Sequence, residues 1–246
     1  MATTHEIQVH TQDGVCPARL FVPLAAGPHP GVLFYMDGLG ARPALWDMAA
    51  RFADSGYVVL LPELFYRTPY APFDAKTAFA VPEERARVIE LVRSVDGEKV
   101  MRDTPAFLDV LASRPDVAKG PFGVVGYCLG GRQALIAAGT FPDRFAAAAS
   151  IHGGRIGAED PWSPAVVAPK ARAEIYAAIA QDDATHTPEM HARLEKALTE
   201  AGVRHTLEHY PANHGFAVPD TAVYDEPSAE RHVAAVLELF GRALRH

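Results

Sequence analysis

Short apolar runs alternate along this chain with longer segments in which apolar residues recur at helical spacing. Two of the runs, Gly31–Met36 and Phe122–Val125, are apolar at nearly every position, which is typical of strands covered on both faces of a sheet. Strands that alternate with helices in this way predict an α/β fold, with a mostly parallel central sheet flanked by helices on both faces. The predicted strands are Glu6–His10 and Ala18–Val22, which we expect to pair as a hairpin at the sheet edge, then Gly31–Met36, Val58–Leu61, Phe122–Val125, Ala146–Ile151, Ala173–Ala180 and Arg204–Tyr210.

The helical segments are bounded by residues that start or stop helices. Gly56 follows the first of them at a position that suits a helix C-cap, and Pro82 suits the first position of a later one. Between these two lies Glu63–Val81, which is rich in proline and aromatic residues without periodicity, so we expect a long loop with a functional role. The predicted helices are Ala44–Asp54, Pro82–Ser113 with breaks, Arg132–Ala138, Pro188–Ala201 and Glu226–Leu244.

Composition and charge argue against some classes of partner and location but do not identify the function. The chain has 246 residues, of which 49% are hydrophobic and 22% charged, as expected of a single domain spanning residues 1–246. A formal net charge of -7 and scattered Lys and Arg residues offer no basic surface, so we do not expect nucleic acid as a partner. No apolar run suggests a membrane span, and Met1–His10 does not resemble a secretory signal, so we expect a cytoplasmic protein. The sequence makes no prediction of the oligomeric state.

Cysteine and histidine spacing gives no sign of a metal site. The chain contains two cysteines and eleven histidines, but no CxxC and no HExxH motif. His205 and His209 are four residues apart in a predicted strand, where they do not share one helical face. We therefore expect neither a metal ion nor a cofactor.

The strongest chemical signal is Gly126-Tyr127-Cys128-Leu129-Gly130, between a predicted buried strand and a predicted helix. In this context G-x-C-x-G is typical of a nucleophile elbow, a sharp turn whose glycines let neighbouring backbone approach closely. The turn also places the Cys128 sulfur at a helix N-terminus, which favours a thiolate. The alternative is that Cys128 is a small buried apolar residue, as most free cysteines are, but the context favours a nucleophile. Cys16 has no such setting, and we expect it to be structural.

A histidine and an aspartate follow at the positions that such a nucleophile requires. In folds with this elbow the acid and then the histidine come later in the chain. His214 lies between the last predicted strand and the last helix, where the general base is expected. The strand Ala173–Ala180 is followed by Asp182 and Asp183, and we favour Asp183 as the acid that orients the imidazole. The spacing alone leaves Asp182 as an alternative.

These residues resemble the dienelactone hydrolases (carboxymethylenebutenolidases), a family of the α/β-hydrolase superfamily. The sequence at 126–131 resembles the family's elbow, Asp183 its acid and His214–Ala217 its histidine loop. The likeness runs from the strand at Gly31 to the last helix, and the cysteine is its specific part. It implies an α/β-hydrolase fold and a Cys-His-Asp triad that hydrolyses esters or lactones through an acyl-thioester intermediate.

The resemblance also implies roles for residues beside the triad. The backbone N–H groups of Leu129 and Gly38 would form the oxyanion hole. Asp37 stands where the family has a glutamate that contacts the resting thiol, and its side chain is one methylene shorter.

Substrate recognition departs from the family. Dienelactone hydrolases bind a substrate carboxylate through arginines, one of them four residues beyond the histidine, where this chain has Val218. This departure predicts a preference for neutral lactones or small esters. Tyr66 and Arg67 in the long loop, and Arg85 or Arg87 in the next helix, are candidate substrate contacts, with solvated surface arginines as an equal alternative.

Three functions fit the sequence. The first is a dienelactone hydrolase-like enzyme whose partner is a small-molecule ester or lactone. The second is a general carboxylesterase or thioesterase of the same fold, and the third is a binding protein that retains the pocket without catalysis. The presence of Cys128, His214 and Asp183 in one chain favours an enzyme, and the natural substrate is not indicated.

Overall fold

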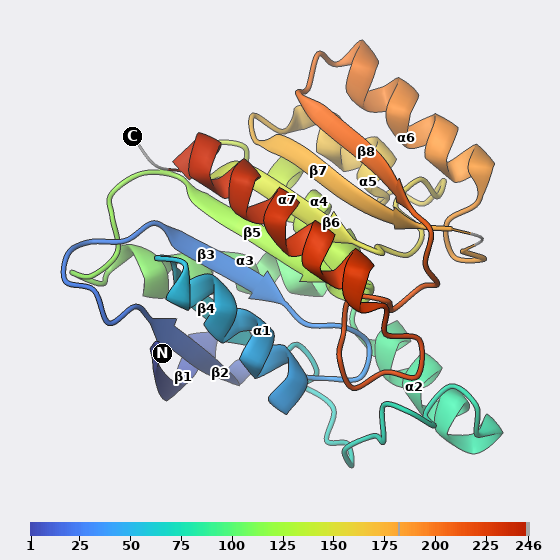
Figure 1. Ribbon diagram of the computed structural model, residues 1–246, viewed down its shortest axis with the longest axis horizontal. Helices are drawn as coiled ribbons and strands as arrows, with labels where there is room; N and C mark the ends of the chain where they lie inside the picture. The colour runs from blue at the N-terminus through green and yellow to red at the C-terminus, as the bar shows by residue number, and fades with distance from the viewer. Residues whose placement is uncertain (182, 245–246) are drawn as a thin grey trace.

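The computed structural model describes residues 1–181 and 183–244, and its centre is an eight-stranded sheet with the order β1-β2-β4-β3-β5-β6-β7-β8 (Figure 1). β1 and β2 form an antiparallel hairpin at one edge, β2 is antiparallel to β4, and every other pairing is parallel. The mostly parallel sheet expected from the sequence is therefore confirmed. The strands are β1 (Thr3–Thr11), β2 (Gly14–Val22), β3 (Gly31–Tyr35), β4 (Val58–Pro62), β5 (Phe122–Tyr127), β6 (Phe145–Ile151), β7 (Glu174–Ala180) and β8 (His205–Tyr210).

Helices cover both faces of this sheet, as Figure 1 shows. Two helices, α1 and α7, pack on one face, whereas α3 and α4 pack on the other. Helix α4 begins at Leu129, directly after Cys128, whereas the sequence pattern predicts its start at Arg132. The helices are α1 (Pro43–Asp54), α2 (Pro82–Ser94), α3 (Gly97–Ala112), α4 (Leu129–Thr140), α6 (Pro188–Glu200) and α7 (Glu226–Leu244), with two short additions that were not predicted, α5 (Pro164–Val167) and the 3₁₀ helix η1 (Ala168–Lys170).

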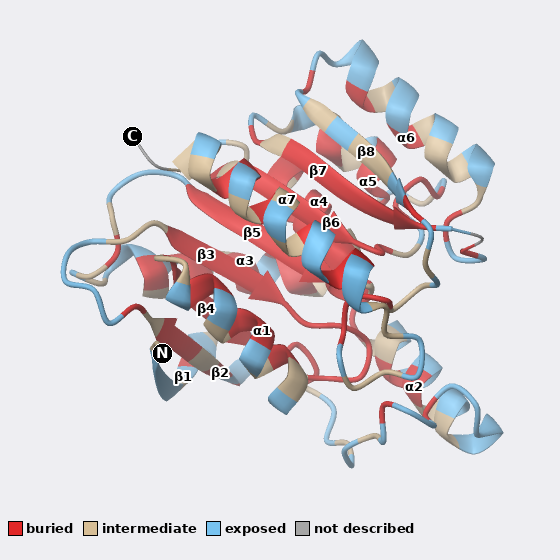
Figure 2. Cartoon of the chain, in the orientation of Figure 1, coloured by how far each residue is buried: buried red, intermediate tan, exposed pale blue. Residues whose placement is uncertain are grey.

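The middle strands are buried because helices lie on both sides of them. Every residue of β3 and β5 is buried, and Figure 2 shows these strands in red between helices whose outer faces are exposed. Burial of such apolar runs is the main favourable contribution to folding. Since the central strands run parallel, their carboxyl ends meet at one edge of the sheet, and the loops that follow β3, β5, β7 and β8 gather there.

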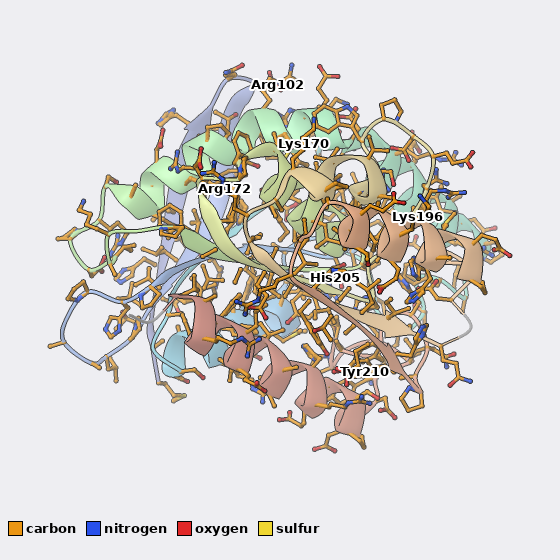
Figure 3. All side chains as sticks on the ribbon, turned by 90° about the horizontal axis from the view of Figure 1, so that it is seen from above. Arg102, Lys170, Arg172, Lys196, His205 and Tyr210 are labelled. Carbon is orange, nitrogen blue, oxygen red and sulfur yellow. The ribbon has the colours of Figure 1, made fainter. Side chains whose placement is uncertain are left out.

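Basic side chains are spread over different elements of the surface (Figure 3). Arg102 on α3 lies 2.9 Å from the carboxylate of Asp13, and Lys196 on α6 lies 2.5 Å from Glu200. Each of these two basic groups thus has an acidic partner. Within residues 1–181 and 183–244, no helix combines the length and apolar character needed to cross a bilayer.

Candidate active site

Cys128 occupies a strained turn between β5 and α4. Its backbone angles are φ 52° and ψ -112°, a left-handed conformation that costs a residue with a side chain about 1–3 kcal/mol. The two flanking glycines are required by close backbone contacts: a methyl group on Gly126 would collide with the carbonyl of Gly130, and one on Gly130 would collide with the carbonyl of Met36. The local sequence therefore permits a turn that leaves the Cys128 side chain partly exposed.

The structure brings Cys128, His214 and Asp183 into one hydrogen-bonded line. The Nε2 atom of His214 lies 3.0 Å from the Cys128 sulfur, and its Nδ1 atom lies 2.6 Å from Oδ2 of Asp183. The other carboxylate oxygen of Asp183 accepts hydrogen bonds from the backbone N–H of Thr185 at 2.8 Å and from its hydroxyl at 2.7 Å. Asp182, the alternative acid, lies outside the described residues.

The neighbouring charges of Cys128, His214 and Asp183 shift the pKa values of His214 and Asp183. Burial alone would lower the pKa of His214, but the neighbouring Cys128 sulfur and the Asp183 carboxylate raise it well above its usual value. Burial would likewise raise the pKa of Asp183, but the hydrogen bonds from His214 and Thr185 outweigh this effect and lower it. Asp183 is therefore held ionised, and a proton on His214 is stabilised between two acceptors.

A cavity of about 320 Å³ opens beside the sulfur, formed by loops after β3, β6 and β8 and by the long segment before α2. Its size suits a small acyl group. Of the described residues that line it, Lys76 is the only lysine or arginine. The lining residues are Asp37, Gly38, Leu39, Ala75, Lys76, Phe79, Ala80, Cys128, His152, His214, Gly215, Thr221, Ala222 and Val223.

The two expected oxyanion donors come from different elements, the N-terminus of α4 and the loop after β3. Leu129 is the first residue of α4, where backbone N–H groups have no partner within the helix. Gly38 belongs to the loop after β3 and lines the cavity together with Cys128. A methyl group on Gly38 would meet Val92 of α2 at 2.9 Å, so the loop packs closely under that helix.

Asp37 lines the same cavity, but the structure gives its carboxylate a different partner from the thiol. Both oxygens accept hydrogen bonds from Arg42, at 2.7 and 2.9 Å, and one also accepts the N–H of Leu39 at 2.9 Å. Sequence reasoning missed Arg42, because nothing in the local pattern marks an arginine at a helix N-cap as the partner of an aspartate in the preceding loop.

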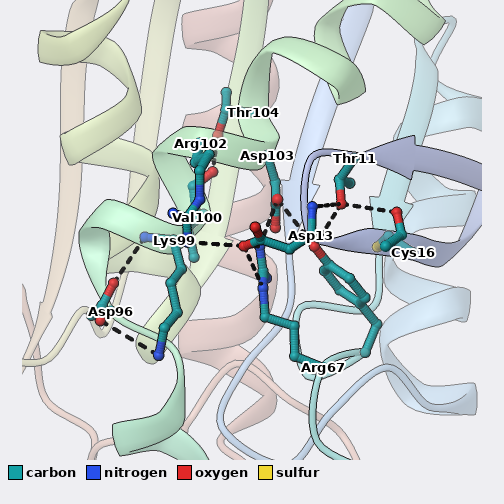
Figure 4. A network of polar contacts seen from close by, with 12 residues as sticks. Thr11, Asp13, Cys16, Arg67, Asp96, Lys99, Val100, Arg102, Asp103 and Thr104 are labelled. Carbon is teal, nitrogen blue, oxygen red and sulfur yellow. Dashed lines mark hydrogen bonds and ion pairs between the residues drawn. The ribbon is translucent and has the colours of Figure 1, made fainter.

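The structure does not bring Arg67 and Tyr66 into the cavity. Arg67 donates to the carboxylates of Asp13 and Asp103 at 2.6 and 2.7 Å, and Tyr66 donates to Asp103 at 3.1 Å (Figure 4). The Asp103 side chain is 1% exposed, so a buried carboxylate must be neutralised there. Arg67 therefore neutralises buried Asp103 in a network that does not line the cavity.

The remaining residues proposed for substrate recognition also lie outside the cavity lining. Arg85 is exposed on α2, and Arg87 is paired with Glu84 on the same helix at 2.7 Å. Val218 is fully buried and follows His214 in the loop between β8 and α7. It is not among the residues that line the cavity, so it forms no apolar wall there.

His152 is a cavity residue whose role the sequence analysis did not identify. It follows β6 at φ 39°, its Nδ1 accepts a hydrogen bond from the backbone N–H of Cys128 at 3.2 Å, and its ring packs edge-on against His214 at 5.2 Å. Burial, together with the nearby His214, lowers the pKa of His152 well below its usual value, so this imidazole is neutral. The sequence signal was the His152-Gly153-Gly154 triplet directly after a buried strand.

Known proteins with related sequences and folds share this arrangement of strands and helices. A crystal structure assigned as a dienelactone hydrolase from Klebsiella pneumoniae superposes with a TM-score of 0.84 at 25% identity, covering 98% of this chain and 99% of that one. An acylaminoacyl peptidase from Pyrococcus horikoshii superposes at 0.71 with 15% identity over 99% of this chain and 42% of that chain, a likeness of fold alone. The chain thus has the α/β-hydrolase fold.

Sequence relatives point to one family. Carboxymethylenebutenolidase 1 of Cupriavidus pinatubonensis is 28% identical over 85% of this chain and 85% of its own length. The carboxymethylenebutenolidase of Pseudomonas putida is 30% identical over 57% of this chain and 58% of its own length. A model of the dienelactone hydrolase family matches residues 16–244. The chain therefore belongs to the dienelactone hydrolase family, whose members hydrolyse lactone and ester bonds.

Proposed function

We propose that this protein hydrolyses small carboxylic esters or lactones by covalent catalysis, with Cys128 as nucleophile, His214 as general base and acid, and Asp183 as the orienting carboxylate. The observation that carries the proposal is the continuous series of hydrogen bonds from the Cys128 sulfur through His214 to Asp183. Cys128 and His214 both line the cavity, where a substrate can reach them. A nucleophile within hydrogen-bond reach of a base, itself oriented by a third group, is the usual sign of such catalysis.

The proposed reaction has two steps. In the first, the Cys128 sulfur attacks the substrate carbonyl carbon, the proton held on His214 passes to the leaving alkoxide, and an acyl-thioester forms. In a lactone the released hydroxyl stays attached to the acyl group. In the second, His214 takes a proton from water, the resulting hydroxide attacks the thioester carbon, and the sulfur leaves. The N–H groups of Leu129 and Gly38 are proposed to stabilise the negative oxygen in both steps.

A panel of lactones, aryl esters and thioesters, combined with mass spectrometry of the quenched protein, tests this proposal. We expect a rapid initial release of phenol from an aryl ester, and an increase in protein mass equal to one acyl group located on Cys128. Hydrolysis of the panel with the acyl group on another residue, or with no initial burst and no adduct, would contradict the mechanism. Comparison of the three substrate classes also separates a lactonase from a general carboxylesterase or a thioesterase.

We expect an uncharged substrate to be favoured, because an anion entering this cavity must lose water, and Lys76 is the only lysine or arginine among the described lining residues. The predicted measurement is a higher kcat/KM for the methyl ester of an acidic lactone than for the acid itself. Because Lys76 is exposed, Lys76→Met should lower kcat/KM for the acid by at most about 5-fold and leave the ester unchanged.

Lys170, exposed on η1 and absent from the cavity lining, provides the matched control. Lys170→Met should change kcat/KM for neither the acid nor the methyl ester. A strong preference of the unmodified protein for the acid that survives Lys76→Met would show that another cation binds the substrate.

A further inference from the structure

Arg42 joins two loops that form different walls of the cavity. It is the N-cap residue of α1, at the end of the loop that begins with Asp37. From there its guanidinium also reaches Asp220, in the loop after His214, with two further hydrogen bonds of 2.7 and 2.9 Å. The first loop carries Gly38, and the second carries His214 and the cavity residue Thr221.

Every N–H donor of this guanidinium has a partner. Nε donates to Asp220, Nη1 to Asp37 and to the carbonyl of Gly40 at 3.2 Å, and Nη2 to both aspartates. Arginine has five such donors in a rigid planar fork, so their complete use fixes the position of both carboxylates. The side chains of Arg42 and Asp37 are only 11% and 7% exposed, which limits competition from water.

The contacts around Asp37 shape the backbone on both sides of Gly38. Asp37 accepts the N–H of Leu39 through its side chain, and Gly40 adopts φ 88°, a left-handed conformation suited to glycine. The half-buried Glu63 carboxylate accepts the N–H of Ala41 at 3.0 Å. The orientation of the peptide that presents the Gly38 N–H is therefore determined largely by charged side chains.

We propose that Arg42 is a positioning residue for the oxyanion hole, which holds the Gly38 N–H in place by fixing Asp37 and ties this loop to the histidine loop through Asp220. The inference rests on the proposed function, because it assigns Gly38 a role in binding the oxyanion. In this proposal Asp37 fixes the conformation of the loop that contains Gly38. Arg42 acts through the backbone and does not touch the substrate.

The decisive variant is Arg42→Lys, which keeps the charge and replaces the planar fork with a single ammonium group. We expect kcat for an aryl ester to fall about 100-fold, the scale of losing one oxyanion donor, with little change in KM. The rate of Cys128 alkylation by iodoacetamide should remain that of the unmodified protein, because His214 and Asp183 are untouched. Asp220→Asn should lower kcat less, and combining it with Arg42→Lys should add little.

Arg51 provides a matched control on the same helix. It also makes two hydrogen bonds to one carboxylate, that of Glu230 of α7, at 2.8 Å each, and neither of these bonds goes to a loop of the cavity. Arg51→Lys should leave kcat unchanged. Thermal unfolding of both variants, and hydrogen exchange of the Leu39 and Ala41 amides, separate a local loosening of the turn from a general loss of stability: only Arg42→Lys should speed exchange at these amides.

The outcomes are distinguishable. An unchanged kcat in folded Arg42→Lys, with the unmodified protein active, would overturn the positioning role and leave the proposed function standing. A parallel loss of kcat and of alkylation rate would show that Arg42 acts on the triad through the histidine loop, which overturns its role at the oxyanion hole. If the unmodified protein hydrolyses nothing in the panel, the proposed function fails, and the oxyanion role of Arg42 fails with it. Unchanged amide exchange in Arg42→Lys would overturn the loop-fixing role whatever the activity.

Discussion

Replacement of Cys128 by alanine is expected to abolish ester hydrolysis, with a loss of kcat on the order of 10⁶-fold, the scale measured for the nucleophile of a serine triad. The reason is that no other side chain in the described cavity combines a nucleophilic atom with a contact to His214 like the 3.0 Å distance of the sulfur. The measurement is the initial rate on an aryl ester with the unmodified protein and with Cys128→Ala, alongside their circular dichroism spectra.

The second cysteine is the control. Cys16 is fully buried, its sulfur faces the carbonyl oxygens of Pro17 and Glu63, and burial raises the pKa of its thiol. Iodoacetamide should therefore inactivate the protein in step with modification of Cys128 alone. Cys16→Ala should retain activity, and full activity after complete alkylation of Cys128 would remove this residue from the mechanism.

Asp183→Asn is expected to lower kcat by about 10⁴-fold, as the equivalent change does in serine triads, by favouring the wrong tautomer of His214. Here the orientation of the new amide is itself dictated by Thr185, whose N–H and hydroxyl both donate to one carboxylate oxygen. The amide oxygen should take that position, which leaves its NH₂ group facing Nδ1 of His214. That nitrogen would then become an acceptor, and the ring proton would move to Nε2, opposite the sulfur.

The companion variant is Asp182→Asn, for which we expect a small effect on turnover. Thr185→Val removes one of the two donors that orient the amide, so in the Asp183→Asn background it should restore part of the lost activity. Equal losses from the two aspartate variants, or a greater loss from Asp182→Asn, would contradict the assignment of Asp183 as the acid.

The features that could be predicted from the sequence are those that depend on residues close together in the chain. The elbow around Cys128 depends on Gly126 and Gly130, each two positions away, because backbone contacts there leave no room for a side chain. Buried parallel strands likewise show as continuous apolar runs, so the order of strands and helices could be predicted almost completely. Helix α4 was expected three residues too late because its first turn contains Gly130 and Gly131, which favour a loop when considered without the elbow.

The features that the sequence did not predict depend on pairings between distant residues. Arg42 and Asp220 are separated by 178 positions, and no periodicity or spacing brings them together. Arg67 was a candidate substrate contact, with a solvated surface arginine as an equal alternative, but the structure pairs it with the buried Asp103. Each of these arginines is thus held by two carboxylates: Arg42 by Asp37 and Asp220, and Arg67 by Asp13 and Asp103.

The left-handed backbone at Cys128 places stability and the proposed chemistry in conflict at this position. A glycine there would adopt φ 52° without steric penalty and so favour the folded state, but it would remove the sulfur. In the proposed mechanism the sulfur is the nucleophile, so the residue that would relieve the backbone strain could not carry out the reaction. Gains in heat resistance must therefore come from parts of the fold remote from the elbow.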